Sequence, residues 1–306
     1  SRDKKNKLVL EPYFYLSEKR YSFADFLTVS SLCNNTAQCF YYICLPNEHW
    51  VAFAKDDVEI LLGFYQEFYQ GKKYPKRLNL PLAYARKLSG LHKSQITSDE
   101  PNLLELTQLV AKDDFGAKLQ VPKKLNATLR DYQLHGLHWL RFLKKFQLGG
   151  ILADDMGLGK TLQTIAFLLA EQGKAKSKLP SLIICPTSLV NNWLQELQRF
   201  APSLSVVVSF GSQRQKQFVK LSKADCIITT YPLLVRDEAI FNDLVFEHVI
   251  LDEAQTIKNI NAKVSRHVKA LNSNFNLCLS GTPVENNLSE LKSLLDFTMP
   301  GLLPSQ

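Results

Sequence analysis

The sequence predicts an α/β protein whose larger part is a parallel sheet with helices on both faces, preceded by a small α+β domain. From residue 149 onward, short runs rich in Val, Ile and Leu alternate with helix-length runs, as in sheets whose parallel strands are joined by crossover helices. The first 122 residues lack this alternation and are dense in Tyr and Phe. These two observations divide the chain into an accessory domain with its linker, residues 1–122, and an α/β domain, residues 123–306.

A hairpin and several helices are predicted in the accessory domain. Residues 38–54 contain two apolar runs around the turn signal Pro46-Asn47, and residues 58–71 form a helical run that Gly71 closes. Residues 81–91 and 101–112 also have helical patterns, and the linker over 113–127 is polar and broken by Gly and Pro. The hairpin aromatics could stack on nucleic-acid bases, but their alternating spacing is more typical of a packed core. They include Tyr41, Tyr42 and Trp50.

Six strands and five helices are predicted in the α/β domain. The strands cover residues 149–153, 181–185, 205–210, 226–231, 248–253 and 275–281. The helices cover residues 160–172, 188–200, 213–222, 232–241 and 260–272. Parallel α/β sheets bind their ligands at the carboxyl ends of the strands, so the polar residues that follow these strands are the candidate site.

Composition indicates some properties of the protein but does not by itself identify its function. The net charge is +8, of which residues 123–306 carry +6 (21 Lys and Arg against 15 Asp and Glu), a weak indication of a polyanionic partner. No run of eighteen apolar residues occurs, so no membrane span is predicted. The six Cys lack metal-binding spacing and are expected to be reduced core residues of a cytosolic protein.

The segment DDMGLGKT directly after the apolar run 149–153 has the composition of a phosphate-binding loop. Gly157 and Gly159 allow the backbone to close around an anion, Lys160 can reach the β- and γ-phosphates, and the Thr161 hydroxyl can ligate Mg²⁺. A turn that merely starts a helix is the alternative, but the strand before and the helical pattern after it favour a nucleotide site. The candidate nucleotide-binding residues are Asp154, Asp155, Met156, Gly157, Leu158, Gly159, Lys160 and Thr161, with Asp154 where the strict pattern has its first glycine.

Asp252 and Glu253 form a second candidate site behind the apolar run 248–251. Mg²⁺ takes few protein ligands and keeps most of its waters, so one carboxylate at a strand end suffices to hold it. A second carboxylate beside the first can orient and deprotonate an attacking water. A solvated strand end is the alternative; the phosphate loop upstream favours catalysis, with Lys160, Asp252 and Glu253 as the catalytic set and Thr161 and Asp252 at the metal.

Five segments in order resemble motifs I, Ia, Ib, II and III of superfamily-two helicases, in the variant of the Swi/Snf-type DNA-translocating ATPases. They are DDMGLGKT (154–161), IICPTSLVNNW (183–193), ITTYPLL (228–234), LDEAQTIKN (251–259) and LSGTPVENNLSELKSLLDFTMPGLL (279–303). Residues 129–140 are similar to that family's upstream adenine-recognition motif. The resemblance covers residues 129–304 and implies a P-loop RecA-like fold that uses ATP and Mg²⁺. Gln255 stands where the family usually has His, a variant associated with bacterial members, which implies the bacterial cytosol or nucleoid.

The resemblance also implies roles for single residues. Gln133 would read the adenine edge, because an amide both donates and accepts. Ser280 and Thr282 would link hydrolysis to the nucleic-acid face together with Gln255, although a simple turn is the alternative for this segment. Contacts to DNA phosphates would come from Pro186, Thr187, Ser188, Thr229 and Thr230. Ser188 could instead cap a helix, Lys258 could be solvated rather than near phosphate, and Trp193 is expected to be a packing anchor.

The expected partners are double-stranded DNA and a second RecA-like lobe of the same parent chain. In this family the second lobe carries motifs IV to VI with an arginine finger, and residues up to 306 do not include them, so the chain by itself is expected to turn over very slowly. Residues 1–122 could also recruit a protein partner. Two other functions remain open: a strand-separating DNA or RNA helicase of the same superfamily, and a non-catalytic ATP-dependent scaffold.

Overall fold

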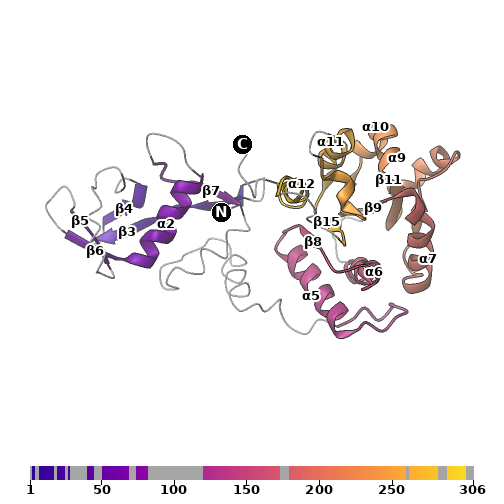
Figure 1. Ribbon diagram of the computed structural model, residues 1–306, viewed down its shortest axis with the longest axis horizontal. Coiled ribbons are helices and arrows are strands. Elements are labelled where there is room, and N and C mark those ends of the chain that lie inside the picture. The colour runs from indigo at the N-terminus through magenta and orange to yellow at the C-terminus, as the bar shows by residue number, and fades with distance from the viewer. Residues whose placement is uncertain are drawn as a thin grey trace. The chain divides into compact units, whose positions relative to one another are not determined.

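The computed structural model divides the chain into two compact units, Ser1–Asp114 and Phe115–Ser305 (Figure 1). It describes residues 2–3, 7–16, 19–24, 27, 40–44, 50–68, 74–81, 120–172, 179–259, 262–281 and 288–300. The contact boundary falls within the predicted linker over 113–127, a few residues before the predicted division at residue 122.

The described residues of the first unit form antiparallel strands and a helix. A three-stranded sheet has the order β1 (Arg2–Asp3), β2 (Lys7–Leu10) and β7 (Leu78–Pro81), and two further pairs are β3 (Tyr13–Leu16) with β4 (Lys19–Ser22) and β5 (Phe40–Cys44) with β6 (Trp50–Ala54). Strands β5 and β6 confirm the predicted hairpin, and α2 (Lys55–Phe68) confirms the helix predicted over 58–71, beginning three residues earlier. Phe23, Phe64, Tyr65 and Leu80 are buried, and the rings of Phe23 and Tyr65 stack with centroids 6.1 Å apart.

Other predictions for this unit fall on residues that the structure does not describe. The helix over 101–112 and most of that over 81–91 lie outside the described residues, and Pro81 ends strand β7 instead of starting a helix. The side chains of Tyr41, Tyr42 and Trp50 are likewise outside them, so the choice between core and base stacking stays open.

The second unit contains a six-stranded sheet in which all neighbouring strands are parallel, and it confirms the predicted α/β fold. The strand order is β10 (Val206–Val208), β11 (Cys226–Thr230), β9 (Ser181–Cys185), β13 (His248–Leu251), β15 (Asn276–Leu279) and β8 (Gly150–Leu152). All six predicted strands are present. The last described strand, β15, lies between β8 and β13, so the segments that follow these three strands come together at one edge of the sheet.

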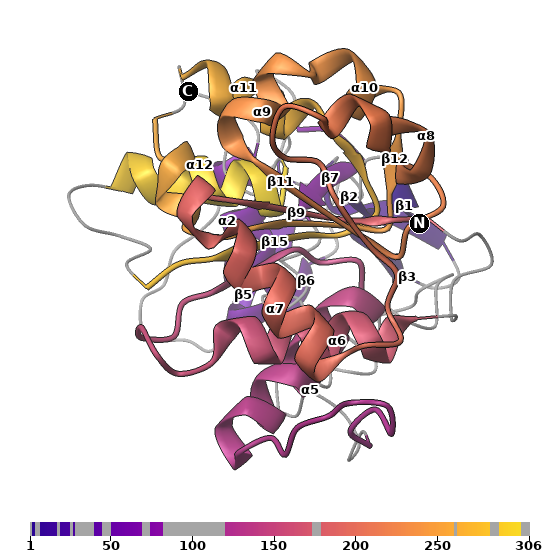
Figure 2. The same cartoon turned by 90° about the vertical axis from the view of Figure 1, so that its right-hand side faces the viewer.

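Helices cover both faces of this sheet (Figure 2). One face carries α5 (Asp131–Lys145), α6 (Lys160–Glu171) and α7 (Val190–Phe200). The other carries α9 (Tyr231–Arg236), α10 (Glu238–Asn242), α11 (Lys263–Ala270) and α12 (Leu288–Thr298). Short pieces complete the unit: η3 (Thr187–Leu189), η4 (Arg214–Gln217), α8 (Phe218–Leu221), η5 (Ala254–Ile257), and the parallel pair β12 (Val245–Phe246) and β14 (Asn272–Ser273).

Three predicted helices are interrupted. The helix predicted over 213–222 is divided into the 3-10 turn η4 and the short α8. The helix predicted over 188–200 begins as the 3-10 turn η3 before α7, and the helix over 232–241 is divided between α9 and α10 at Asp237. The carboxylate of Asp237 accepts hydrogen bonds from Arg214 Nε (2.6 Å) and Nη2 (3.0 Å). This long-range ion pair sits at the break, and neither it nor the β12–β14 pair is visible as a local pattern in the sequence.

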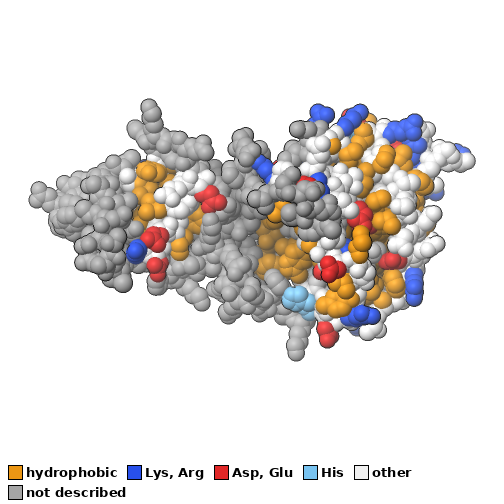
Figure 3. Space-filling model, in the orientation of Figure 1, with side chains coloured by type: hydrophobic (Ala, Val, Ile, Leu, Met, Phe, Trp, Pro, Cys, Tyr) orange, Lys and Arg blue, Asp and Glu red, His pale blue; other side chains and the backbone are white. Residues whose placement is uncertain are grey.

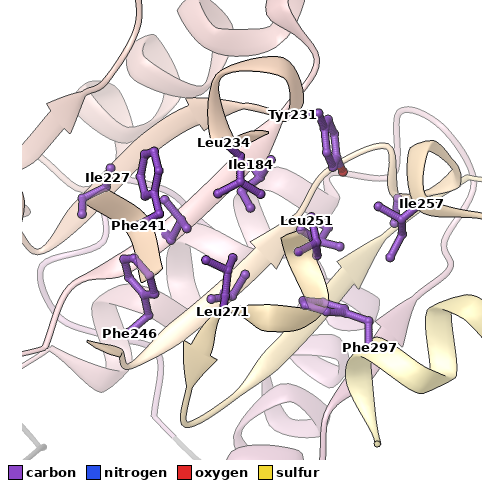
Figure 4. Close-up of a cluster of buried hydrophobic side chains, with 14 of the residues drawn as sticks. Ile184, Ile227, Tyr231, Leu234, Phe241, Phe246, Leu251, Ile257, Leu271 and Phe297 are labelled. Carbon is purple, nitrogen blue, oxygen red and sulfur yellow. The ribbon is translucent and has the colours of Figure 1, made fainter. Parts of the chain in front are cut away.

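The core on the α9–α12 face is a continuous cluster of buried side chains (Figure 4). Leu182 and Ile184 of β9 face it from the sheet, while Phe241, Phe246 and Phe297 close it from the covering segments. Ile183 is equally buried but points to the opposite face, because strand side chains alternate. Fully burying side chains of this size stabilises the fold by about 1.5–3 kcal/mol each.

The described cysteines of this unit are core residues, as predicted. Cys185, Cys226 and Cys278 are free and buried. Burial raises the pKa of the Cys185 and Cys226 thiols to about 12, so they stay protonated and unreactive at neutral pH. Within the described part of the chain, no helix is both long and apolar enough to cross a bilayer.

His248 is a buried histidine at the start of β13. Its Nδ1 lies 2.9 Å from Ser181 Oγ, and its ring packs edge-on against Phe167 and Phe275. Burial first, and then the nearby charge of Lys144, hold its pKa well below 6.5. Between this lowered pKa and pH 6.5, His248 is therefore neutral in the folded protein and protonated in the unfolded chain.

We predict that this histidine makes the second unit sensitive to acid. The free energy of unfolding keeps its full value above pH 6.5. It decreases as the pH falls from 6.5 toward the lower pKa of the folded state, because in that range the unfolded chain is protonated at this histidine and the folded protein is not. Below pH 6.5 the wild type should lose up to about 1.4 kcal/mol per pH unit relative to His248→Gln. Denaturant unfolding at pH 7.5 and 5.5 measures this, and equal pH slopes in both proteins would contradict it.

Candidate active site

The segment 154–161 forms an open loop between β8 and α6. Gly157 (φ 83°) and Gly159 (φ 78°) adopt left-handed backbone conformations, which L side chains rarely do. A Cβ built on Gly157 would meet no atom within 4 Å, so the space beside this residue is open. Gly159 is the N-cap of α6 and provides no side-chain cap, which leaves the first N–H groups of the helix to be satisfied by an anion or water.

Lys160 and Thr161 lie in the first turn of α6 and are partly exposed. Lys160 Nζ donates to the carbonyl oxygens of Asp154 (2.7 Å) and Asp155 (3.1 Å). The ammonium therefore points back into the loop, the position from which it can meet a bound phosphate. Residues 155–158 are exposed, and Met156 has 74 % of its surface accessible.

Gln163 of α6 supports the loop by a hydrogen bond, and it is not among the site residues that the sequence predicts. Its side chain is fully buried, and its Nε2 donates to Asp154 Oδ2 at 2.9 Å. Its Oε1 has no hydrogen-bond partner among the described residues and lies against Gly136 of α5, where an added Cβ would be 1.9 Å away. The hydrogen bond from Gln163 thus anchors the carboxylate of Asp154, the residue at the position of the first glycine.

Gln133 joins the adenine-recognition segment to the loop. Its Oε1 accepts from the N–H of Arg130 (3.0 Å), and its Nε2 donates to the carbonyl oxygen of Leu158 (3.2 Å). One donor and one acceptor of the amide are thereby used within the protein, and one of each remains for a ligand. Gln133 is thus placed at the nucleotide loop; the adenine role remains a prediction.

Asp252 lies one residue beyond β13 and is held by several donors. Its Oδ2 accepts from Trp193 Nε1 (2.8 Å), its Oδ1 accepts from the N–H of Glu253 (3.0 Å), and its carbonyl oxygen accepts from the hydroxyl of Tyr231 (2.7 Å). Burial raises the pKa of Asp252, and Lys160 is close enough to lower it in part. The loop lysine follows β8 and the carboxylate follows β13, so both lie at the same edge of the sheet.

Glu253 adopts a backbone conformation that is uncommon for a residue with a side chain (φ 51°, ψ 54°). Thr256 holds it there, since its N–H and Oγ1 both donate to the Glu253 carbonyl oxygen. The Glu253 carboxylate accepts from Gln255 Nε2 at 2.5 Å, and Gln255 Oε1 accepts from Ser280 Oγ at 3.2 Å. Strained residues of this kind cluster at active sites, and Glu253 carries the second carboxylate of the pair.

The segment after β15 meets the phosphate loop. Ser280 donates its N–H to the Leu152 carbonyl oxygen, and a Cβ on Gly281 would lie 3.2 Å from Met156 Cγ and 4.0 Å from Lys160 Nζ. Ser280 thus contacts both the β8 strand and, through Gln255, the carboxylate pair. Thr282 lies outside the described residues.

The predicted DNA-contact residues divide into two groups. Thr187 and Ser188 are exposed in η3, after the partly exposed Pro186 at the end of β9. Thr229 and Thr230 are buried, and the Thr229 hydroxyl donates to the Ser209 carbonyl oxygen (3.2 Å). The expectation that these two threonine side chains face a phosphate is therefore wrong, because both faces of β11 are covered.

For three further residues, the structure corrects or extends what the sequence predicts. The N-cap of α7 is Leu189, without a side-chain cap, so Ser188 does not cap this helix. Lys258 is neither solvated nor presented to a phosphate: its Nζ lies 3.0 Å from Glu290 Oε2 of α12, and both side chains are largely buried. Trp193 is fully buried, as predicted for a packing anchor, and in addition donates to Asp252.

A parallel sheet with a glycine loop and a carboxylate pair at its carboxyl edge defines the RecA-like class of nucleotide-dependent proteins. Within that class, a family model described as SNF2-related domain matches residues 132–306, more than half of the chain. The chain belongs to this family, which confirms the Swi/Snf-type resemblance.

Relatives and solved structures agree with this assignment. The chain is 44% identical over 200 residues to the TATA-binding protein-associated factor MOT1 of Saccharomyces cerevisiae (61% of this chain, 11% of that protein). It is 43% identical over 189 residues to the putative ATP-dependent helicase/translocase YwqA of Bacillus subtilis (61% and 20%). An uncharacterized ATP-dependent helicase of Mycoplasma genitalium is 35% identical over 266 residues (85% and 26%). The SWI2/SNF2 ATPase core of Sulfolobus solfataricus in complex with double-stranded DNA is similar with a TM-score of 0.58 and 43% identity (62% and 39%).

The matches cover most of this chain but only a small part of each relative. The chain spans about a tenth to a quarter of the length of the curated relatives named above. The Mycoplasma match extends over 85% of this chain, beyond the 61% that the other two reach, so part of the first unit is also shared with that relative.

We predict that Gly136→Ala destabilises the second unit by about 1–3 kcal/mol, because the new methyl group would displace Gln163 from Asp154. Gly63 is the matched control, a helical glycine of α2 with open space where its Cβ would be. Gly63→Ala should stabilise its own unit by roughly 0.5–1 kcal/mol. Thermal unfolding of the two variants measures both effects, and an unchanged transition in Gly136→Ala would contradict the role of Gln163.

Proposed function

We propose that this chain contains the first ATP-binding lobe of a double-stranded-DNA translocase that couples ATP hydrolysis to movement on DNA. The observation that carries the proposal is that the segment after β15 joins Lys160 of the loop to the carboxylate pair after β13, the next-but-one strand from β8. A Cβ on Gly281 would lie 4.0 Å from Lys160 Nζ, and Ser280 is bonded through Gln255 to Glu253. These are the groups that a phosphate chain, its metal ion and an attacking water require.

The residues present fit ATP and Mg²⁺. The open space beside Gly157, the uncapped start of α6 and the Lys160 ammonium suit the phosphates, and the spare donor and acceptor of Gln133 suit the adenine edge. Asp252 supplies a hard oxygen ligand whose buried charge a cation would compensate, and Thr161 adds a hydroxyl. When bound, Mg²⁺ neutralises the charge that develops on the phosphate oxygens.

Glu253 is the base in this proposal. Its carboxylate would orient the water and take its proton, and the hydrogen bond from Gln255 fixes where that carboxylate points. Gln255 is also bonded to Ser280, so a movement of the segment after β15 would alter the position of the base. This chain of hydrogen bonds is the coupling route that we assign to Gln255 and Ser280.

Duplex DNA would lie along the exposed start of η3. Thr187 and Ser188 offer neutral hydroxyl donors to phosphates, which position a duplex and carry no sequence information. Lys and Arg side chains are scattered among acidic and apolar ones on the face that Figure 3 shows, which favours weak, nonspecific binding. The DNA complex of the Sulfolobus ATPase core supports this partner.

A second RecA-like lobe of the parent protein would complete the site. An arginine finger contributes about 10³–10⁵ in rate, so residues 1–306 alone should hydrolyse ATP very slowly. We further propose that residues 1–122 recruit a protein partner and that the parent protein works in the bacterial cytosol or nucleoid. Strand separation is the competing activity, because some relatives are named helicases; a strand-displacement assay on the parent protein distinguishes the two.

We predict that the chain binds ATP with Mg²⁺ and that Lys160→Ala abolishes this binding, because the only loop side chain placed to meet the phosphates is removed. Calorimetry measures the affinity. Lys220→Ala is the matched control, since it removes an exposed lysine of α8 and lowers the net charge equally. Equal binding by wild type and Lys160→Ala would refute the assignment of the phosphate loop.

A further prediction concerns DNA. Fluorescence anisotropy should detect weak binding of duplex, preferred over single strand, and lost steeply between two salt concentrations. Replacing Thr187 and Ser188 by Ala should weaken it by about three- to tenfold, as the loss of one or two neutral hydrogen bonds does. Thr229→Val is the control, because that threonine is buried and should leave DNA affinity unchanged. Tight, salt-insensitive, single-strand-specific binding would overturn the translocase proposal.

A further inference from the structure

Trp193 makes a contact that packing alone does not require. The indole is fully buried in α7, and its Nε1 donates to Asp252 Oδ2 at 2.8 Å across 59 positions of sequence. A buried indole N–H needs an acceptor, but a backbone carbonyl would serve it. Here the acceptor is the carboxylate at the carboxyl edge of the sheet, and a charged acceptor makes the hydrogen bond shorter and stronger.

The two oxygens of Asp252 are held separately. Glu253 N–H binds Oδ1 at 3.0 Å and Trp193 binds Oδ2, so the plane of the carboxylate is fixed by donors from two different elements. A carboxylate has about four lone-pair positions, and these two bonds leave about two of them for other partners. The carboxylate follows β13 and the phosphate loop follows β8, so both lie at the same edge of the sheet, on either side of the segment after β15.

The side chain of Trp193 is enclosed by packed secondary-structure elements. Trp193 lies in the helix that packs on β11 and α6, on the same sheet face as the loop helix, and no part of its ring reaches solvent. Tyr231 offers a useful contrast: its hydroxyl donates to the backbone carbonyl of Asp252 at 2.7 Å and leaves the carboxylate untouched. One residue therefore holds the side chain of Asp252 and the other its backbone.

We propose that Trp193 is a positioning residue that holds the Asp252 carboxylate, through its indole N–H, in the orientation that binds the Mg²⁺ of the nucleotide. The inference rests on the proposed function, in which Asp252 is the metal ligand. It assigns Trp193 a role in metal affinity beyond the packing role that the sequence predicted.

The test removes the N–H without changing the shape of the side chain. Trp50→Phe and Trp139→Phe leave Trp193 as the only tryptophan of the three in the chain. Growth of this double variant with 3-benzothienylalanine then replaces the indole N–H of residue 193 by sulfur. The reference is the same double variant grown with tryptophan, and calorimetry measures its affinity for ATP in Mg²⁺ and in EDTA.

We expect both proteins to bind ATP equally in EDTA, and the sulfur analogue to bind about tenfold more weakly than the reference in Mg²⁺, the loss typical of an outer-shell partner of a metal ligand. Equal affinity of analogue and reference in Mg²⁺ would overturn the inference, and so would an equal loss of affinity by the analogue in EDTA, where no metal is bound. A reference protein that binds ATP no better in Mg²⁺ than in EDTA would overturn the metal role of Asp252 as well.

Discussion

The position of β15 between β8 and β13 is the constraint on which the site depends. Parallel pairing on both sides of β15 fixes the distance between the phosphate loop after β8 and the carboxylates after β13. It also puts Ser280 and Gly281 in contact with both, through Gln255 on one side and Met156 on the other. The register is strongly specified, because a slip by one residue would exchange the side chains that pack against the two helical layers.

Buried polar side chains from three helices hold the groups of the site in place by hydrogen bonds. Gln163 holds Asp154, Gln133 holds the carbonyl oxygen of Leu158, and Trp193 holds Asp252. Each of these donors comes from a helix on the same face of the sheet, so the groups that would touch a nucleotide are braced by α5, α6 and α7 together. Buried polar networks raise specificity only when their members are satisfied, and most members here have partners.

The two sheet faces serve different purposes. The α9–α12 face holds the apolar cluster around Leu182 and Ile184, together with the Lys258–Glu290 ion pair that ties the segment after β13 to α12. The α5–α7 face holds the supports of the loop and of Asp252. The burial of Thr229 and Thr230 in β11 follows from this arrangement, because a central strand covered on both faces presents no side chain to a ligand.

The sequence by itself determined the six strands, most helices and the loop with its carboxylate pair, because each rests on a local pattern of apolar residues, glycines and charges. The division of the helix at Asp237, the burial of Thr229, and the contacts Gln163–Gly136, Lys258–Glu290 and Trp193–Asp252 were decided by the tertiary structure. These features join residues that are far apart in the chain. Local periodicity does not encode the strand order that brings them together, so only the folded sheet could show that a predicted packing anchor also holds a carboxylate of the candidate active site.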